Sequence, residues 1–325
     1  MKRIFPPLVL LFLAPGVSQL LSNELAPVSF FTPFGLTILP MIYGVGAILI
    51  RELVRRRHMG WASLLLLGAV FGIVREGLML KSFYDPLWAG IDVLGYYGRW
   101  AGINWIWCLE RTIYHAVISV GIPILLTELM FPSFRKDAWL GKRVAIVLAM
   151  VFAMNIVFGY FFGTDYQPGA VQYWLTVAAA AVLFVAAWRL PGEVEKPKDM
   201  RVMPPILFWF IGFIGTILFM VVFWALPNTS TPPAVTALLA AMLTAGIICL
   251  VTWLSGNARA WDDRHRLALA TGPLSIFIIT TPIEEFFRTR LGSTTGMVLV
   301  GLGALILLGW LHWRTIKRAR EGRDG

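Results

Sequence analysis

The chain has 325 residues, of which 58% are hydrophobic and only 14% are charged. This composition exceeds what a soluble domain can bury, and apolar stretches of about 20 residues recur from end to end, which excludes a soluble globular protein. The net charge of +10 does not call for nucleic acid, because basic loops of a membrane protein face anionic lipid headgroups. We therefore expect membrane lipids, and no nucleic acid, as partners.

The hydropathy pattern predicts an all-α, polytopic membrane protein with about ten transmembrane helices, each long enough to cross ~30 Å of hydrocarbon. No soluble domain remains, so residues 1–325 form a single integral membrane domain. Within it, we expect a polar site in the helices of 33–163, and 164–325 supply the remaining helices. The predicted spans are 4–21, 33–50, 60–80, 104–130, 144–163, 171–190, 206–226, 234–254, 268–283 and 294–313.

The first span has two interpretations. Lys2 and Arg3, followed by an apolar run and small residues, resemble a secretory signal. We favour a retained helix, because Ala14-Pro15-Gly16 is typical of a break within a helix rather than of a cleavage site. Residues 22–32 would then form an outer, partly re-entrant loop. Cleavage would remove one span and leave the orientation of the others unchanged.

The distribution of basic residues predicts the orientation. With the N-terminus inside, most of the 28 lysines and arginines fall in cytoplasmic segments, as the positive-inside rule requires. We therefore expect both termini in the cytoplasm, loop 81–103 outside, and a multi-pass protein of the cell membrane.

Two charge pairs interrupt otherwise apolar spans. Arg75-Glu76 lies near the outer end of the third span and Glu110-Arg111 near the outer end of the fourth. An ionisable group in hydrocarbon costs roughly 2.5–3.5 kcal/mol on insertion scales, so such groups are usually paired and often functional. Their similar depth predicts an ion pair between Glu76 and Arg111.

A polar stripe follows the fourth span at helical spacing. His115 lies near the middle of the membrane, one turn below Arg111, and Asn155 of the fifth span reaches a similar depth. The stripe comprises Asn104, Cys108, Arg111, His115 and Ser119.

These residues admit a structural and a catalytic interpretation. Arg75 and Arg111 can belong to an ion-pair network that fixes how the helices pack. Alternatively, a carboxylate and an imidazole share a cavity and perform general acid/base chemistry. The candidate catalytic residues are Glu76, His115, Glu52 and Glu110. No cofactor or metal is expected, because the chain has no paired-cysteine spacing, no H-E-x-x-H and no phosphate-binding loop.

Three ordered segments resemble the motifs of PrsW-type glutamic intramembrane proteases. Arg51-Glu52-Leu53-Val54-Arg55 resembles an EExxK segment, Phe71–Glu76 an F-x-x-x-E segment, and Arg111–Ser119 an R…H…S helix. The resemblance covers residues 51–119. It implies that the glutamates and the histidine activate water to hydrolyse a peptide bond within the membrane.

A second segment, Pro282–Arg288, is similar to the EExxxR motif of the CAAX-protease and bacteriocin-processing family, but it is one residue short. We interpret Glu284 and Glu285 as an acidic pair at the outer surface.

Two other classes of function remain open. Buried charges can serve as substrate or proton sites in a small-solute or proton-coupled transporter. The lack of a complete motif also fits a non-catalytic subunit of a membrane complex. The sequence leaves open whether the substrate is a membrane-embedded peptide or a small molecule, and it does not determine the oligomeric state.

Overall fold

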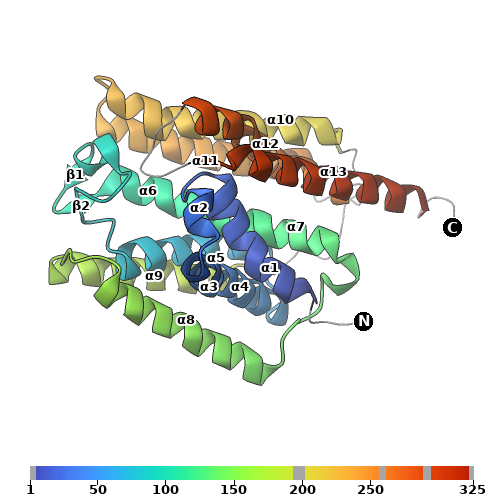
Figure 1. Cartoon of the computed structure of the whole chain (residues 1–325), viewed down its shortest axis with the longest axis horizontal. Coiled ribbons are helices and arrows are strands. Elements are labelled where there is room, and N and C mark those ends of the chain that lie inside the picture. Colours follow the sequence, from blue (N-terminus) through green and yellow to red (C-terminus); the bar gives the residue numbers. More distant parts are fainter. Residues whose placement is uncertain (1–4, 193–201, 256–260, 288–293, 322–325) are drawn as a thin grey trace.

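The computed structural model describes residues 5–192, 202–255, 261–287 and 294–321. In this part of the chain, nine helices are long and apolar enough to cross a membrane, and Phe5–Leu21 is a shorter apolar helix. The chain is therefore an all-α polytopic membrane protein, and each of the ten predicted spans coincides with a helix. The start of α1 (Phe5–Pro15) and the end of α13 (Met297–Glu321) lie at the same end of the bundle (Figure 1).

The N-terminal half alternates α-helices with π-helical segments. Its elements after α1 are η1 (Gly16–Leu21), α2 (Pro27–Phe30), α3 (Pro33–Leu39), η2 (Pro40–Gly44), α4 (Val45–Arg56), α5 (Trp61–Ile73), η3 (Val74–Met79), η4 (Asp92–Gly95), β1 (Arg99–Trp100), β2 (Ile103–Asn104), α6 (Trp105–Tyr114), η5 (His115–Gly121), α7 (Ile122–Met130) and η6 (Pro132–Phe134).

The C-terminal half contains mostly long helices. Its elements before α13 are α8 (Lys142–Phe162), α9 (Ala170–Arg189), α10 (Pro205–Met220), η7 (Val221–Ala225), η8 (Leu226–Asn228), α11 (Pro233–Ser255) and α12 (Asp263–Phe287).

Several helices extend beyond the predicted spans at the end of the bundle where α1 begins and α13 ends. The second span was expected to stop at residue 50, yet α4 continues to Arg56; α12 begins at Asp263 and α13 continues to Glu321. The prediction ended each span at the first charged residues. A helix can continue into the headgroup region, because its backbone hydrogen bonds are internal and its charged side chains reach water there.

The expected break in the first span is a change of helix type rather than an interruption. Pro15 ends α1, and π-helical η1 follows it directly. The hydroxyl of Ser18 donates to the carbonyl of Ala14 across this junction, at 2.8 Å. Because Ala14, Pro15 and Ser18 are all buried, other helices enclose the junction.

The bundle has a central layer and two peripheral layers. In the most apolar stretch of Trp105–Met130, 83% of the residues are buried, whereas only 6% are buried in Lys142–Phe162. Figure 1 shows α8 along one side of the molecule and α10 to α13 along the opposite side, with α1 and α4 to α7 between them. The central helices therefore provide the enclosed environment that a polar site in a membrane needs.

Loop 81–103 packs against the bundle rather than lying free on its surface. Lys81 is fully buried and donates to the carbonyls of Tyr160 and Thr164, at 2.9 and 3.0 Å. Burial lowers the pKa of Lys81, while the charge of Asp165 acts in the opposite direction. Strands β1 and β2 form a two-stranded antiparallel hairpin in the same loop.

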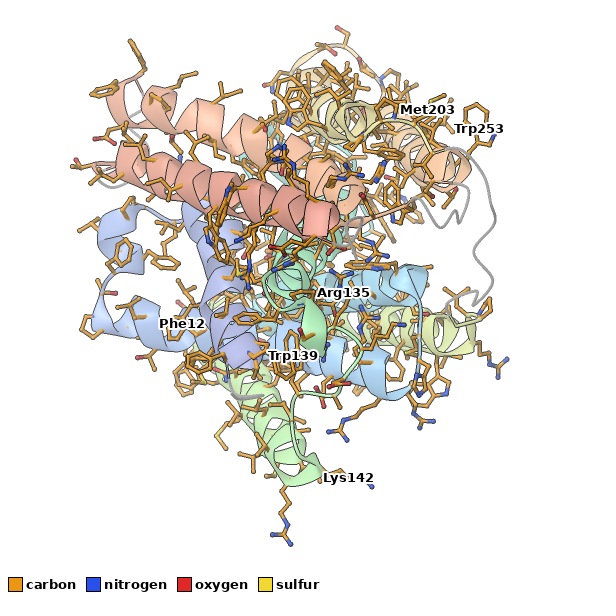
Figure 2. All side chains as sticks on the ribbon, turned by 90° about the vertical axis from the view of Figure 1, so that its right-hand side faces the viewer. Phe12, Arg135, Trp139, Lys142, Met203 and Trp253 are labelled. Carbon is orange, nitrogen blue, oxygen red and sulfur yellow. The ribbon has the colours of Figure 1, made fainter. Side chains whose placement is uncertain are left out.

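A polar network stabilises the end of the bundle near the termini, where Figure 2 shows Arg135, Trp139 and Lys142. The guanidinium of Arg51 is fully buried, lies 3.6 Å from the ring of Trp139 and donates to Glu128 at 3.2 Å. It also donates to the carbonyls of Phe134, Arg135 and Asp137. Arg51 thus holds residues 134–137 against α4.

Candidate functional site

The two central candidates, Glu76 and His115, each lie in a π-helical segment. Glu76 belongs to η3, which continues α5, and His115 begins η5, which continues α6. A π-helical turn contains an extra residue, so it changes the direction of the side chains that follow, and such turns are frequent at functional sites. In this molecule, the two segments direct a carboxylate and an imidazole toward each other.

Glycines bring the two helices into close contact. A Cβ atom at Gly68 would lie 2.9 Å from Cα of Ala116, and one at Gly72 would lie 2.9 Å from Cβ of His115. Residues four apart lie on one helix face, and small residues at this spacing let membrane helices approach closely. Glu76 occurs one further turn along the same face, so the glycines position its carboxylate beside His115.

The site is a chain of hydrogen bonds centred on His115. Its Nε2 lies 3.0 Å from Oε1 of Glu76, and its Nδ1 lies 2.8 Å from Oγ of Ser119. Glu76 is 2% exposed and His115 is 1% exposed. A neutral imidazole with its proton on Nε2 donates to Glu76 and accepts from Ser119, which satisfies both ring nitrogens.

The second carboxylate oxygen of Glu76, Oε2, accepts a hydrogen bond from loop 81–103. The hydroxyl of Ser82 donates to Oε2 of Glu76 at 2.6 Å, and the indole of Trp107 donates to the same hydroxyl at 3.1 Å. Sequence reasoning missed both residues. The available signal for Ser82 was its position six residues after Glu76, at the start of the loop that closes this span.

Arg75 supplies the cation next to the carboxylate. Its Nη1 donates to Oε1 of Glu76, and its guanidinium lies 5.1 Å from the ring of Tyr43. The ring of Tyr43 in turn lies 6.0 Å from that of His115, and Phe71 packs edge-on against His115 at 5.7 Å. The carboxylate and imidazole are therefore bordered by a guanidinium and two aromatic rings.

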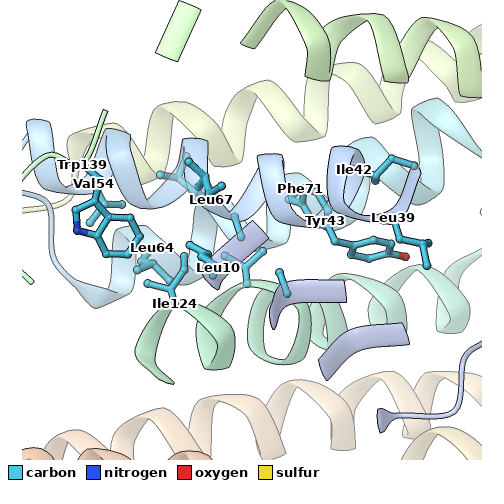
Figure 3. Packing of buried hydrophobic residues seen from close by; sticks show 14 of the residues in the cluster. Leu10, Leu39, Ile42, Tyr43, Val54, Leu64, Leu67, Phe71, Ile124 and Trp139 are labelled. Atoms are coloured by element: carbon cyan, nitrogen blue, oxygen red, sulfur yellow. The ribbon is translucent and has the colours of Figure 1, made fainter. Parts of the chain in front are cut away.

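Two buried polar atoms beside this pair have no protein partner. Among the described residues, neither the hydroxyl of Tyr43 nor Nε of Arg75 makes a hydrogen bond. Leaving a buried donor unsatisfied costs about 1–3 kcal/mol, so such atoms are rare and need an explanation. Tyr43 was also missed from the sequence, although Pro40 in the same span is a signal for irregular backbone. Figure 3 shows Tyr43 beside Phe71 in the packed interior.

The predicted ion pair between Glu76 and Arg111 is wrong. Arg111 instead donates to Glu110 through Nε and, at 2.9 Å, through Nη2, and its Nη1 lies 3.1 Å from Oε1 of Glu24. Arg75 and Arg111 each pair with the glutamate next to them in sequence, so Arg75 neutralises Glu76 and Glu110 neutralises Arg111. Glu110 therefore makes its contacts in a second cluster rather than with His115.

This second cluster anchors the segment 22–26. Besides the contact of Arg111 with Glu24, the hydroxyl of Tyr114 donates to Oγ of Ser22 at 2.7 Å. Asn23 donates to Oε2 of Glu284 at 2.8 Å. Glu284 is only 8% exposed, so the expectation that it lies at the surface is wrong; the 22–26 segment covers it.

The structure does not bring Glu52 to this site. Its carboxylate accepts from Arg56 at 2.9 Å and from the backbone N–H of Trp139 at 3.0 Å. Figure 3 shows Trp139 at the opposite end of the packed cluster from Tyr43. The joint role of Glu52 and Glu76 that the protease resemblance implies is therefore not supported by their positions, because the two residues lie at opposite ends of the bundle.

The remaining stripe residues divide between the site and its surroundings. Asn104 donates to the carbonyl of Asp85 at 3.0 Å and accepts from Arg99 at 2.5 Å, so it fixes the loop that carries Ser82. Asn155 donates to the carbonyl of Val151 in its own helix, at 2.8 Å. Of the predicted stripe, Ser119 is the residue whose side chain bonds to the imidazole of His115.

Comparisons with known proteins identify a family. The model of an uncharacterized membrane protein family matches residues 8–316, so the chain belongs to that family. An uncharacterized protein of Archaeoglobus fulgidus is 24% identical over 204 residues, which are 59% of this chain and 59% of the relative. The alignment thus spans less than two thirds of the relative's length. No solved structure matches the chain.

Proposed function

We propose that this member of an uncharacterized membrane protein family is a membrane-embedded hydrolase of the glutamic intramembrane protease type, acting in the cell membrane on a membrane-embedded peptide. The observation that carries this proposal is the 3.0 Å contact between Glu76 and His115 inside the bundle. A paired carboxylate and imidazole are the groups that general acid/base catalysis uses most often.

The unpartnered donors support the same chemistry. Hydrolysis of a peptide bond develops negative charge on the carbonyl oxygen, and preorganised donors stabilise that charge best where water is excluded. The hydroxyl of Tyr43 and Nε of Arg75 are such donors, since both are buried and neither has a partner among the described residues. They border the rings and charges that surround Glu76 and His115.

The proposed reaction follows from these positions. The Glu76 carboxylate removes a proton from a water molecule, and the resulting hydroxide attacks the peptide carbon, which forms a C–O bond. Tyr43 and Arg75 stabilise the oxyanion. Glu76 then returns the proton to the amide nitrogen as the C–N bond breaks, while His115, held by Ser119, keeps the carboxylate oriented.

The test is cleavage of fluorescence-quenched peptides with a hydrophobic span of about 20 residues, reconstituted with the purified protein in liposomes. We expect Glu76→Gln and His115→Ala each to slow turnover by roughly 10²–10⁴-fold, the usual contribution of general acid/base catalysis. Asn155→Ala is the control, because the amide of Asn155 donates to the carbonyl of Val151 in its own helix. Protein that is folded and transports solutes or protons but cleaves none of the peptides would contradict the proposal and favour a transporter.

A further inference from the structure

A groove lies between the C-terminal helices, on the opposite side of the bundle from α8 and away from the Glu76 site. It encloses about 880 Å³ and is lined by residues of α10, α12 and α13. Helix α12 packs against both α10 and α13 and forms the floor of the groove. Figure 1 shows these helices together along one side of the molecule.

The groove is a long apolar channel. Leu267, Thr271 and Ile278 contribute from α12, and Leu305, Leu308 and Ile316 contribute from α13. On each helix the lining residues follow one face over about 22 Å at 1.5 Å per residue. This length covers half of the hydrocarbon core, about 15 Å, together with part of the headgroup region.

One end of the groove is basic. Arg264 begins the lining face of α12, and Arg320 ends that of α13, so the antiparallel helices place both cations at the end near the termini. Arg264 also contacts Asp262, at 2.7 Å, but a guanidinium carries five N–H donors and retains some for a second anion. His312 lines the groove between this end and its apolar part.

The polar groups in the apolar part are already satisfied. The indole of Trp209 donates to the hydroxyl of Ser275 at 3.1 Å, and that hydroxyl donates to the carbonyl of Thr271 at 2.8 Å. The groove therefore offers hydrocarbon contacts along its length and the guanidinium donors of Arg264 and Arg320 at one end. Its chemistry complements a molecule with a long apolar chain and one anionic headgroup.

We propose that this groove binds one anionic phospholipid, with its phosphate between Arg264 and Arg320 and an acyl chain along α12. Basic pockets between membrane helices on the cytoplasmic side are known to hold anionic headgroups. The site is independent of the proposed hydrolase chemistry.

The chain offers two matched pairs of variants for a test. Arg264→Ala/Arg320→Ala removes the headgroup contacts, and Lys142→Ala/Arg143→Ala removes two exposed cations at the same end of the bundle, outside the groove. Gly309→Leu fills the groove, and Gly303→Leu makes the same change on α13 outside it; a Cβ at either glycine meets no atom within 4 Å.

The measurement is native mass spectrometry of the full chain titrated with phosphatidylglycerol or phosphatidylcholine. We expect the wild type and both controls to retain phosphatidylglycerol preferentially. The double arginine variant should bind it roughly thirtyfold more weakly, and Gly309→Leu should lose the bound lipid while keeping a wild-type melting temperature. Equal retention of phosphatidylglycerol by all variants would overturn the proposal, and so would equal binding of the two lipids. The proposal would also be overturned if Gly309→Leu changed the formation of a dimer and left lipid binding unchanged.

Discussion

Gly72 and His115 are in direct contact. A Cβ atom at residue 72 would lie only 2.9 Å from the Cβ atom of His115, so the absence of a side chain at Gly72 leaves the room that His115 occupies. This contact fixes the distance between α5 and η5. It therefore controls whether Glu76 and His115, which are 39 residues apart in sequence, can form their hydrogen bond.

Adding a methyl group at Gly72 should separate the two helices. We expect Gly72→Ala to destabilise the protein by roughly 1–3 kcal/mol, the usual cost of overpacking, as measured by thermal unfolding in detergent. Gly303→Ala is the control, since it adds the same group in open space and should be neutral or slightly stabilising through its helix propensity. If the two variants unfold at the same temperature, the close contact does not hold the helices together.

Arg111 should matter far more to stability than its partner Glu24. Removing Arg111 leaves the buried Glu110 without its cation, so Arg111→Gln should cost roughly 3–5 kcal/mol. Glu24→Gln should cost less than about 1 kcal/mol, because the side chain of Glu24 is 33% exposed and is screened by water. Chemical denaturation of the two single variants and of the double variant Arg111→Gln/Glu110→Gln measures these differences in the free energy of unfolding. A double variant less stable than Arg111→Gln alone would contradict the pairing.

Arg51 should resist replacement by lysine. Lysine keeps the charge but not the planar set of donors that reaches Glu128 and three backbone carbonyls at once. We expect Arg51→Lys to lower the free energy of unfolding by roughly 1–3 kcal/mol, the cost of leaving buried acceptors unpaired. Arg143→Lys, an exposed change at the same end, should stay within about 0.5 kcal/mol of the wild type. Equal effects would show that Arg51 contributes only its charge.

The orientation predicted from the basic residues has a direct test. The two test variants, Leu87→Cys and Lys142→Cys, are made in a background without Cys108 and Cys249. Leu87 lies in loop 81–103 and is 78% exposed. Lys142 lies at the end of the bundle where α1 begins and α13 ends. A membrane-impermeant maleimide added to intact cells should label residue 87 and not residue 142. The reverse pattern would invert the topology.

Hydropathy alone determined the class of this protein and where its apolar helices lie along the chain. Those properties follow from the solvent, because hydrocarbon admits only long apolar segments whose backbone groups are satisfied internally. It also located Glu76, His115 and Ser119, since charged and polar residues within a span are exceptions that stand out in one dimension.

Tertiary structure decided which of these residues meet. Depth placed Glu76 level with Arg111 and within one turn of His115, and the rotation of each helix about its axis decides which of the two faces Glu76. That rotation depends on the close contact at Gly72 and on the π-helical turns that contain Glu76 and His115. It also brings Tyr43 and Ser82 to the site from other segments. Contacts of this kind depend on three-dimensional packing between helices, which a residue's position along its own helix does not specify.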